Sequence, residues 1–463
     1  MTVVTGIFAF IFILGAAVVL HEFGHFAVAK LFKIRVETFS VGFGPRLFGK
    51  KWGQTDYRVS AIPLGGYVKL GGDESNAPIE GDGASDIPRE ERYDLRPRWQ
   101  RILVALAGPV MNVITALTIP LAGALMYGVP LSPSPIVSYV SQGGAAQVAG
   151  LQAGDHIVSF NGTEQPTWEA ISGDALLSPG QSLPIVVERG GNRVPLTIKP
   201  STINDEGEII GSLDLVPDNG GYPVVLRDVT QDSPAAKAGL QPGDRIVAIN
   251  GDPVRSREHI TMFVREHKLQ PIALTIERNG ERKEVTATAA KLADGSERLG
   301  IMPADEFPLT KPGLLAAGGF AVRSNLEILS LTGKALGQVF AGKRSVRNTL
   351  SGPIGIYEAS SKSVERLGWG GLFRMLGFLS LNLGIFNLLP IPVLDGGAIF
   401  LLLIEGALAP VGLSLSMRVR ERIQQVGFVM VLLLMVFVIT NDVLKKFSRP
   451  GQTEAPAATT PGK

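Results

Sequence analysis

The chain has 463 residues, too many for one compact core, and this length predicts about three domain-sized units. It contains no cysteine, which excludes disulfides, thiolate nucleophiles and cysteine-ligated metals. Cysteine usage therefore does not indicate whether the protein lies in an oxidising or a reducing compartment. The net charge is +2 and no basic stripe with interleaved aromatic residues is present, so we expect protein or membrane lipids as partners and no nucleic acid.

Four segments are long and apolar enough to cross a bilayer, which takes about 20 residues for about 30 Å of hydrocarbon. The first, within residues 1–30, has no Lys or Arg before its apolar core and no small-residue cleavage pattern, so we expect it to be retained. The others lie at 101–128, 373–408 and 425–444. The sequence therefore predicts a polytopic α-helical membrane protein with four transmembrane helices.

Between the first two spans, the chain changes from apolar to mixed composition. Residues 36–72 contain short alternating apolar runs separated by Gly and Pro, a pattern that predicts strands and turns rather than a helix. Residues 73–100 are acidic, then basic, and poor in apolar residues. We expect them to form a solvated polar loop.

The polar middle of the chain contains an internal repeat, AGLQAGDHIVSFNG at 149–162 and AGLQPGDRIVAING at 238–251. Each copy predicts a helix end at Ala-Gly-Leu, a Gly-Asp turn, a strand and an Asn-Gly hairpin turn. We therefore expect two inserted β-rich modules, at 130–215 and 220–305. They resemble the PDZ domains of bacterial proteases, and PDZ domains bind extended peptides by adding a strand to an exposed edge.

The C-terminal third contains further predicted membrane elements. Residues 312–348 have apolar and charged positions at helical spacing and predict an amphipathic helix on the membrane surface. The charged positions are Arg323, Glu327, Lys334 and Lys343. Within the third span, Pro390 and Pro392 predict a break in the helix. We expect residues 447–463 to be a disordered tail.

Four spans place both termini on the same side of the membrane. The connection after the first span is rich in Lys and Arg, and the short connection after the third carries Arg418, Arg420 and Arg422, so both should face the cytoplasm. The two modules and the termini would then lie outside the cytoplasm. Basic residues of the C-terminal tail oppose this orientation; they are Lys445, Lys446 and Arg449.

The first span contains the pattern His-Glu-x-x-His. His21 and His25 are four positions apart, which on a helix places both imidazoles on one face, able to share a metal. Glu22 lies beside them, and in this spacing a Glu acts as general base rather than as ligand. Because burying such groups in a membrane costs at least a few kcal/mol each, an accidental match is disfavoured.

A catalytic zinc takes three protein ligands and leaves one position for water. The remaining histidines, His156, His259 and His267, lie in the polar middle, which leaves two carboxylates in the spans. Asp395 follows the two prolines and precedes two glycines that let the backbone approach a neighbour closely. Glu405 lies about 15 Å further along the helix, near the predicted membrane boundary, where we expect it to be exposed. Asp395 is the favoured third ligand.

These motifs occur in an order that identifies a family. HEFGH lies in the first span, AGPVMN at 107–112 in the second, the PDZ-like modules follow, and NLLPIPVLDGG lies in the third. Over nearly its whole length the chain resembles the site-2 proteases, a family of intramembrane zinc metalloproteases, and specifically their bacterial regulator-of-sigma-E protease branch. The resemblance implies a bacterial inner-membrane protein with modules and termini in the periplasm, and an active site in the cytoplasmic half of the bilayer.

The resemblance also implies an activity. It assigns one catalytic Zn²⁺ to His21, His25 and Asp395 and the role of catalytic glutamate to Glu22. The expected substrates are transmembrane segments of single-pass proteins, of the anti-sigma factor type after a first protease has trimmed them, and remnant signal peptides. The 36–72 region matches the family's membrane-associated β-hairpin, thought to receive the unwound substrate as an added strand. The PDZ-like modules would bind a newly exposed C-terminus or act as a size filter.

A substrate-holding role follows from the same resemblance for Asn387, Pro390 and Pro392. From the residues alone, Asn387 and Asn382 can equally satisfy backbone groups freed by the prolines or hydrogen-bond between helices, and we expect substrate contact at Asn387 before Asn382.

Two other functions remain open. One is a membrane-anchored PDZ scaffold without protease activity, in which the histidines are a remnant or a structural metal site. The other is a metal transporter, for which intramembrane carboxylates, histidines and interrupted helices are also expected.

Overall fold

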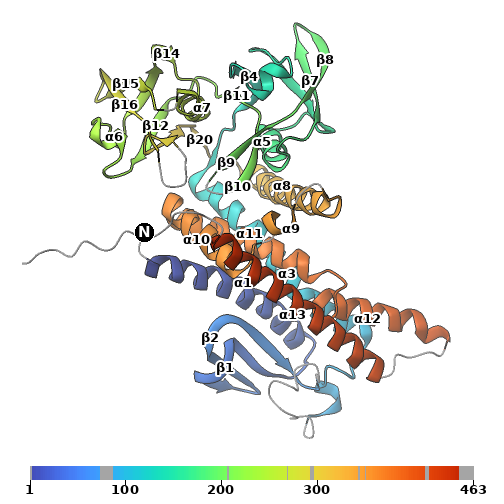
Figure 1. The fold of residues 1–463 in the computed structure, drawn as a ribbon. Coiled ribbons are helices and arrows are strands. Elements are labelled where there is room, and N and C mark those ends of the chain that lie inside the picture. Colours follow the sequence, from blue (N-terminus) through green and yellow to red (C-terminus); the bar gives the residue numbers. More distant parts are fainter. Residues whose placement is uncertain are drawn as a thin grey trace, which may run out of the picture. The chain divides into compact units, whose positions relative to one another are not determined.

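The computed structural model describes residues 3–72, 87–205, 208–267, 269–291, 297–342, 345–349, 351–411 and 417–447. Residues 73–86 of the predicted loop and 448–463 of the predicted tail lie outside this part. The chain divides into a helical unit, residues 1–127 and 312–444, and a β-rich unit that includes residues 128–311. Figure 1 shows both units along the rainbow-coloured chain.

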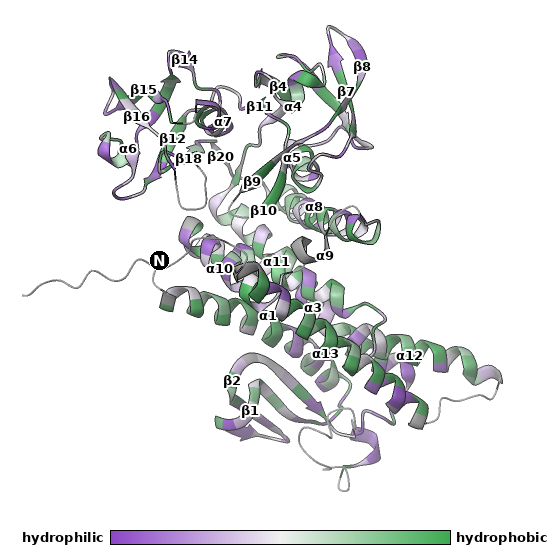
Figure 2. Cartoon of the chain, viewed as in Figure 1, coloured by the Kyte–Doolittle hydropathy of each residue, from purple (hydrophilic) through white to green (hydrophobic). Residues whose placement is uncertain are grey.

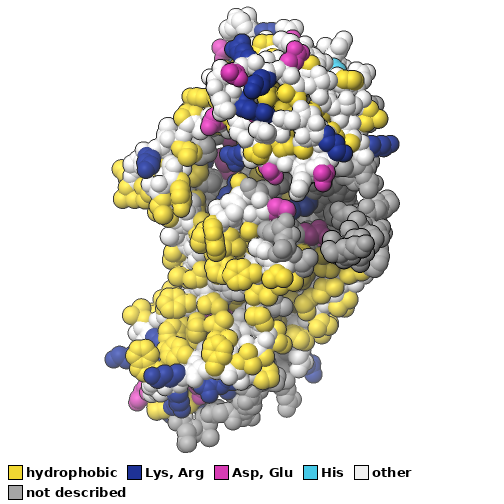
Figure 3. All heavy atoms as spheres, turned by 90° about the vertical axis from the view of Figure 1, so that its left-hand side faces the viewer, with side chains coloured by type: hydrophobic (Ala, Val, Ile, Leu, Met, Phe, Trp, Pro, Cys, Tyr) yellow, Lys and Arg dark blue, Asp and Glu magenta, His cyan; other side chains and the backbone are white. Residues whose placement is uncertain are grey.

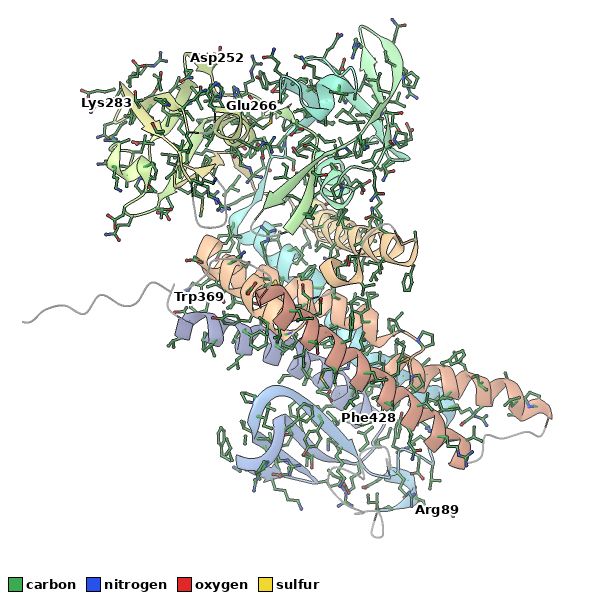
Figure 4. All side chains as sticks on the ribbon, in the orientation of Figure 1. Arg89, Asp252, Glu266, Lys283, Trp369 and Phe428 are labelled. Atoms are coloured by element: carbon green, nitrogen blue, oxygen red, sulfur yellow. The ribbon has the colours of Figure 1, made fainter. Side chains whose placement is uncertain are left out.

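The helical unit is built from long apolar helices. Its elements are α1 (Val3–Leu31), β1 (Val36–Trp52), β2 (Thr55–Leu70), η3 (Arg89–Glu91), α3 (Arg98–Tyr127), α8 (Leu314–Phe340), α9 (Val346–Thr349), α10 (Pro353–Leu367), α11 (Trp369–Asn387), α12 (Asp395–Leu408), η4 (Ala409–Val411) and α13 (Met417–Phe447). Figure 2 shows that hydrophobic residues dominate these helices, and Figure 3 shows apolar side chains gathered on their surface. Figure 4 labels two exposed apolar side chains, Trp369 on α11 and Phe428 on α13.

Among the described helices, five are long and apolar enough to cross a membrane: α1, α3, α8, α11 and α13. The helix break predicted at Pro390 and Pro392 is confirmed, because α11 ends at Asn387 and α12 begins at Asp395. The predicted third span is therefore two helices, and only α11 reaches spanning length. The predicted amphipathic segment is mostly α8, which meets the same length and composition criteria as the four expected spans.

Two buried polar side chains connect helices of this unit by satisfying backbone groups. Pro120 within α3 has no N–H to donate to the carbonyl of Ala116, and Asn325 of α8 donates its Nδ2 to that carbonyl at 3.0 Å. Near the end of α13, the buried carboxylate of Asp442 accepts hydrogen bonds from backbone N–H groups at the start of α10. The donors, each 3.1 Å away, belong to Gly352, Ile354 and Gly355. Such capping offsets the cost of burying a carboxylate.

The predicted β-hairpin region is confirmed as antiparallel strands β1 and β2, joined by a turn at Gly53, whose φ is +60°. The strands bend back on themselves, since Thr38 is paired with both Asp56 and Lys69. The first half of β1 therefore lies between two parts of β2. In the described pairings, the segment 66–70 has a partner strand on one side only and forms an edge of this small sheet.

The β-rich unit contains two modules with the same topology. The first comprises β4 (Ser134–Val140), α4 (Ala145–Val148), β5 (His156–Phe160), β6 (Thr163–Glu164), α5 (Trp168–Leu177), β7 (Leu183–Arg189), β8 (Asn192–Ile198), β9 (Ser201–Asp205), β10 (Glu208–Ser212) and β11 (Leu215–Asp218). The second comprises β12 (Val224–Val229), α6 (Pro234–Lys237), β13 (Arg245–Ile249), β14 (Asp252–Pro253), α7 (Arg257–His267), β15 (Pro271–Arg278), β16 (Glu281–Thr288), β17 (Ala290–Lys291), β18 (Glu297–Arg298) and β19 (Ile301–Asp305). Their sheet orders, β11-β4-β5-β7-β8 and β19-β12-β13-β15-β16, correspond strand for strand. A short pair, β3 (Val129–Pro130) with β20 (Leu309–Thr310), joins the two ends of this segment.

The repeat is also visible at single residues. The predicted Asn-Gly turns are present at Asn161 and Asn250, whose φ angles are +48° and +47°, as two-residue hairpin turns require. In the first module the buried Asp155 accepts two hydrogen bonds of 2.7 Å from Arg189. Asp244 and Arg278 form the equivalent pair in the second module.

We predict that Asp155→Asn loosens the first module locally. Burial raises the pKa of Asp155, but the hydrogen bonds from Arg189 and from the Gln152 N–H lower it more, so the net pKa is below its ordinary value. The ionised carboxylate thus stabilises the fold above the unfolded pKa, and this contribution is lost as pH falls through the folded pKa. At neutral pH, the variant should lose about 1.5–3 kcal/mol of the free energy of local unfolding of the first module. The destabilisation of the module at acid pH should also be smaller in the variant than in the wild type.

Hydrogen exchange of β5 and β7 in the full-length protein measures this effect, because 1.4 kcal/mol corresponds to about tenfold in protection. Glu188→Gln is the control, since it removes one charge from an exposed position on the same strand as Arg189. Equal protection in the two variants would contradict a stabilising role for the pair.

Candidate metal centre

The site begins where α1 and α3 come into very close contact. A Cβ added at Gly24 would lie 2.2 Å from the carbonyl oxygen of Ala107, and one added at Gly108 would lie 2.3 Å from Nε2 of His25. Real Cβ atoms do not tolerate such distances, so both positions require glycine. These glycines bring the histidine face of α1 directly against α3.

The third predicted ligand is supplied by the break between α11 and α12. Cβ atoms at Gly396 and Gly397 would lie 2.3 Å and 2.2 Å from backbone oxygens of the preceding loop, so α12 can pack onto that loop only through glycines. Val393 has a φ of +86°, a strained conformation for a β-branched residue and worth about 1–3 kcal/mol. The loop is held in this shape one residue before Leu394, the N-cap of α12, and Asp395 is the first residue of the helix.

His21, His25 and Asp395, which are far apart in the sequence, form one cluster. The Nε2 atoms of the two histidines are 3.2 Å apart. Nε2 of His21 lies 3.0 Å from Oδ2 of Asp395, and Nε2 of His25 lies 3.4 Å from Oδ1. In a tetrahedral zinc site with bonds of about 2.0–2.2 Å, ligand atoms are separated by about 3.3–3.6 Å. Two imidazoles and a carboxylate at these separations fit zinc, and among the described residues no other such group of three can share an ion.

Each histidine has a further partner at its second ring nitrogen. Nδ1 of His25 lies 2.7 Å from the carbonyl oxygen of Val104, and Nδ1 of His21 lies 3.1 Å from Nδ2 of Asn112. Both partners belong to α3. Asn112 ends the motif AGPVMN, but the motif predicted no role for it. A backbone carbonyl such as that of Val104 cannot be recognised from a sequence. Partners of this kind orient metal-binding imidazoles.

Glu22 lies between the cluster and the small β-sheet. A backbone group of Val68, in the edge segment of β2, hydrogen-bonds with its carboxylate. Gly66 lies beside it too, since a Cβ added there would be 3.6 Å from Cγ of Glu22. The general-base candidate is therefore next to both the ligand candidates and the edge segment of β2.

The structure separates the four residues for which a substrate role was expected. Nδ2 of Asn387 lies 3.3 Å from Nε2 of His21, so this amide reaches the cluster. Asn382 donates to the carbonyl of Phe378 within its own helix, at 2.8 Å, and thus satisfies a backbone group. Pro390 is exposed, whereas Pro392 is half-buried and lies against Gly427 of α13, where an added Cβ would be 2.3 Å away.

The expectation for Glu405 was wrong. We expected an exposed acid near the membrane boundary, but Glu405 is only 5% exposed. It forms an ion pair with Arg420 at the start of α13, one of the residues that favoured a cytoplasmic connection. The reason is that α13 begins at Met417, before the predicted 425, so Arg420 lies on a helix packed near α12. Glu405 has a partner of its own and belongs to no metal-binding group in the described residues.

Comparison with known proteins gives a family. The family model described as Peptidase family M50 matches residues 9–434. The chain belongs to peptidase family M50. The expected resemblance to site-2 proteases of the regulator-of-sigma-E protease branch is thereby confirmed.

Relatives of this M50 peptidase align over almost their full length. This chain is 33% identical over 455 residues to the regulator of sigma-E protease RseP of Escherichia coli (strain K12), and the alignment covers 94% of this chain and 97% of that protein. It is 32% identical over 459 residues to a putative zinc metalloprotease of Vibrio cholerae, with the same coverage. Among solved structures, it is 22% identical to the PDZ domain of the SdrC-like protein of Listeria monocytogenes, covering 17% of this chain and 85% of that one. The TM-score of this last comparison is 0.16.

We predict that Asp395→Asn lowers the zinc content of the purified M50 peptidase by at least about tenfold, because an amide is a much poorer zinc ligand than a carboxylate. Zinc per folded protein, measured by mass spectrometry of the metal, tests this. Glu405→Gln is the matched control and should retain its zinc. If Asp395→Asn bound zinc normally and Glu405→Gln did not, the ligand assignment would be reversed.

Proposed function

We propose that this chain is a zinc endopeptidase that cleaves the transmembrane segment of single-pass membrane proteins. The observation that carries the proposal is the cluster of His21, His25 and Asp395 with Glu22 beside it. The histidines and Glu22 lie on α1, which is apolar enough to cross a membrane, and Asp395 is the first residue of α12, which follows the spanning-length helix α11. A buried constellation of ionisable groups in such helices is functional by default.

The proposed reaction is hydrolysis of a peptide bond. A bound zinc ion would polarise the scissile carbonyl and acidify a water molecule. The carboxylate of Glu22 accepts the proton of the attacking water and returns it to the nitrogen of the leaving amine, so that one peptide bond and one water give a carboxylate and an amine. Asn387, whose amide lies near His21, donates a hydrogen bond to the substrate backbone, and the loop with Pro390 and Pro392 bounds the substrate position.

A transmembrane substrate must lose its helical structure before cleavage, since a helix hides its peptide bonds. The edge segment 66–70 has a partner strand on one side only and lies close to Glu22. An unwound substrate strand that added to this edge would regain backbone hydrogen bonds next to the general base. Helix-breaking residues in the substrate would make unwinding easier.

We assign four spans, with α8 at the membrane surface and with α11 and α12 together forming the third. The basic residues that follow α1 and α12 orient the protein with the β-rich unit and both termini in the periplasm of a bacterial inner membrane. The active site then lies in the cytoplasmic half. Membrane lipids are the immediate neighbours of the apolar outer faces.

The two β-rich modules are assigned as tandem PDZ domains. The Escherichia coli relative is named regulator of sigma-E protease RseP, which supports an anti-sigma factor, trimmed first by another protease, as a substrate. Remnant signal peptides are a second class. We assign the modules the role of a size filter that excludes substrates with bulky outer domains. Capture of a newly exposed C-terminus is the alternative role for the same domains.

We predict that Glu22→Gln abolishes cleavage but keeps zinc, because the amide cannot carry the proton while the three ligands are intact. Loss of a general base lowers the rate by about 10²- to 10⁴-fold. The measurement is cleavage of a single-pass test protein with a short outer segment by purified enzyme in liposomes, together with zinc content. Glu90→Gln, at an exposed position, is the control.

The same assay separates the two rival functions. A PDZ scaffold without activity predicts that wild-type enzyme leaves the test protein intact. A transporter predicts zinc flux into the liposomes that does not depend on the proton-carrying group of Glu22. Full cleavage by purified Glu22→Gln would remove this residue from the mechanism.

We predict that deleting residues 135–305 allows cleavage of a test protein that still carries a folded outer domain. The deletion retains both strands of the short pair β3 and β20, so the ends stay joined. Cleavage of untrimmed and trimmed substrates is compared in liposomes. The size-filter role fails if the shortened enzyme cuts the trimmed substrate but still spares the untrimmed one.

A further inference from the structure

Asn112 is a fully buried polar residue of the helical unit. Its side chain is 0% exposed, and its Nδ2 lies 3.1 Å from Nδ1 of His21. On its other side is Gly384 of α11, where an added Cβ would lie 3.2 Å from Cβ of Asn112. An amide buried this completely needs hydrogen-bond partners, because an unsatisfied polar group there costs about 1–3 kcal/mol.

The ring nitrogens of the two histidines divide into two sets. Both Nε2 atoms face Asp395, as ligand atoms do. A neutral imidazole that binds a metal through Nε2 carries its proton on Nδ1. For His25, the carbonyl oxygen of Val104 lies 2.7 Å from Nδ1 and accepts the hydrogen bond from Nδ1–H. For His21, the group in the corresponding place is the amide of Asn112.

The amide of Asn112 is oriented with its nitrogen toward His21, and its Oδ1 is buried without a hydrogen-bond partner in the described structure. Nitrogen and oxygen of an amide occupy the same shape, and a half-turn about the last side-chain bond exchanges them. With nitrogen toward His21, Nδ1 must accept, so the proton moves to Nε2 and blocks the metal position. With oxygen toward His21, Oδ1 accepts a hydrogen bond from Nδ1–H, and Nε2 is free to bind the metal.

We propose that Asn112 is a positioning residue for the metal centre, which fixes the metal-binding tautomer of His21 by accepting a hydrogen bond from its Nδ1–H. It does for His21 what the Val104 carbonyl does for His25. The inference rests on the proposed zinc site and adds the residue on which one ligand depends. Asn112 acts through His21 and has no contact with substrate in this scheme.

The test is zinc affinity of the purified full-length protein in detergent, measured by competition with a chromophoric chelator. Asn112→Leu has a similar volume but no acceptor, and it should bind zinc about 10- to 100-fold more weakly. Asn112→Asp keeps an acceptor oxygen and should retain wild-type affinity. Asn325→Leu, the loss of another buried amide in the helical unit, is the matched control and should leave zinc affinity unchanged.

The outcomes separate this inference from the proposed function. If the wild type binds no zinc, the proposed function itself is wrong. If the wild type and Asn112→Leu bind zinc equally, only the role of Asn112 is overturned. Equal weakening in the Leu and Asp variants also overturns it, because an acceptor is then not what the site needs. Should Asn112→Leu not fold, a tenfold loss in the Asp variant alone overturns the proposal.

Discussion

A polar group buried among apolar helices must have a partner, and this requirement accounts for much of the helical unit. In lipid no water replaces a missing hydrogen bond, so each unsatisfied group costs several kcal/mol. Asn325 satisfies a carbonyl that Pro120 leaves free, and Asp442 binds the first N–H groups of α10. The histidines of α1 and the aspartate of α12 obey the same rule, with one another and with α3 as partners.

The candidate metal centre therefore depends on three helices, α1, α3 and α12. α1 supplies both imidazoles and α12 supplies the carboxylate, and two groups of α3, the Val104 carbonyl and the Asn112 amide, lie against the second ring nitrogens. A strained loop around Val393 and two glycines place Asp395 at the first position of α12. Strain of this kind persists only where the surroundings hold it, and here the tightly packed backbone does so.

How far the sequence predicts this site depends on the range of each interaction. His21, Glu22 and His25 are local, because helical spacing alone places them on one face. Asp395 was reachable by elimination, since few carboxylates occur in apolar segments. Asn112 was not, because its role depends on how α3 is rotated against α1, and neither propensity nor composition encodes that rotation.

In the fold, too, the features set by local sequence were predicted, and those set by contacts between distant elements were not. Repeated turns and the helix break follow from Asn-Gly and Pro-x-Pro, which constrain the backbone locally. The sequence misjudged Glu405, because its ion pair with Arg420 depends on where a later helix begins. The sequence predicted a surface helix at 312–348, and the length and composition of α8 do not distinguish it from the crossing helices.

The glycine contact between α1 and α3 also limits how a peptide can enter. Gly24 brings the backbones of the two helices together at the depth of the histidines, and Gly108 leaves room for the imidazoles of His25 and His21 against α3. Parting these helices would pull His25 from Val104 and His21 from Asn112. While these contacts are intact, the substrate strand of the proposed function would have to enter between other helices.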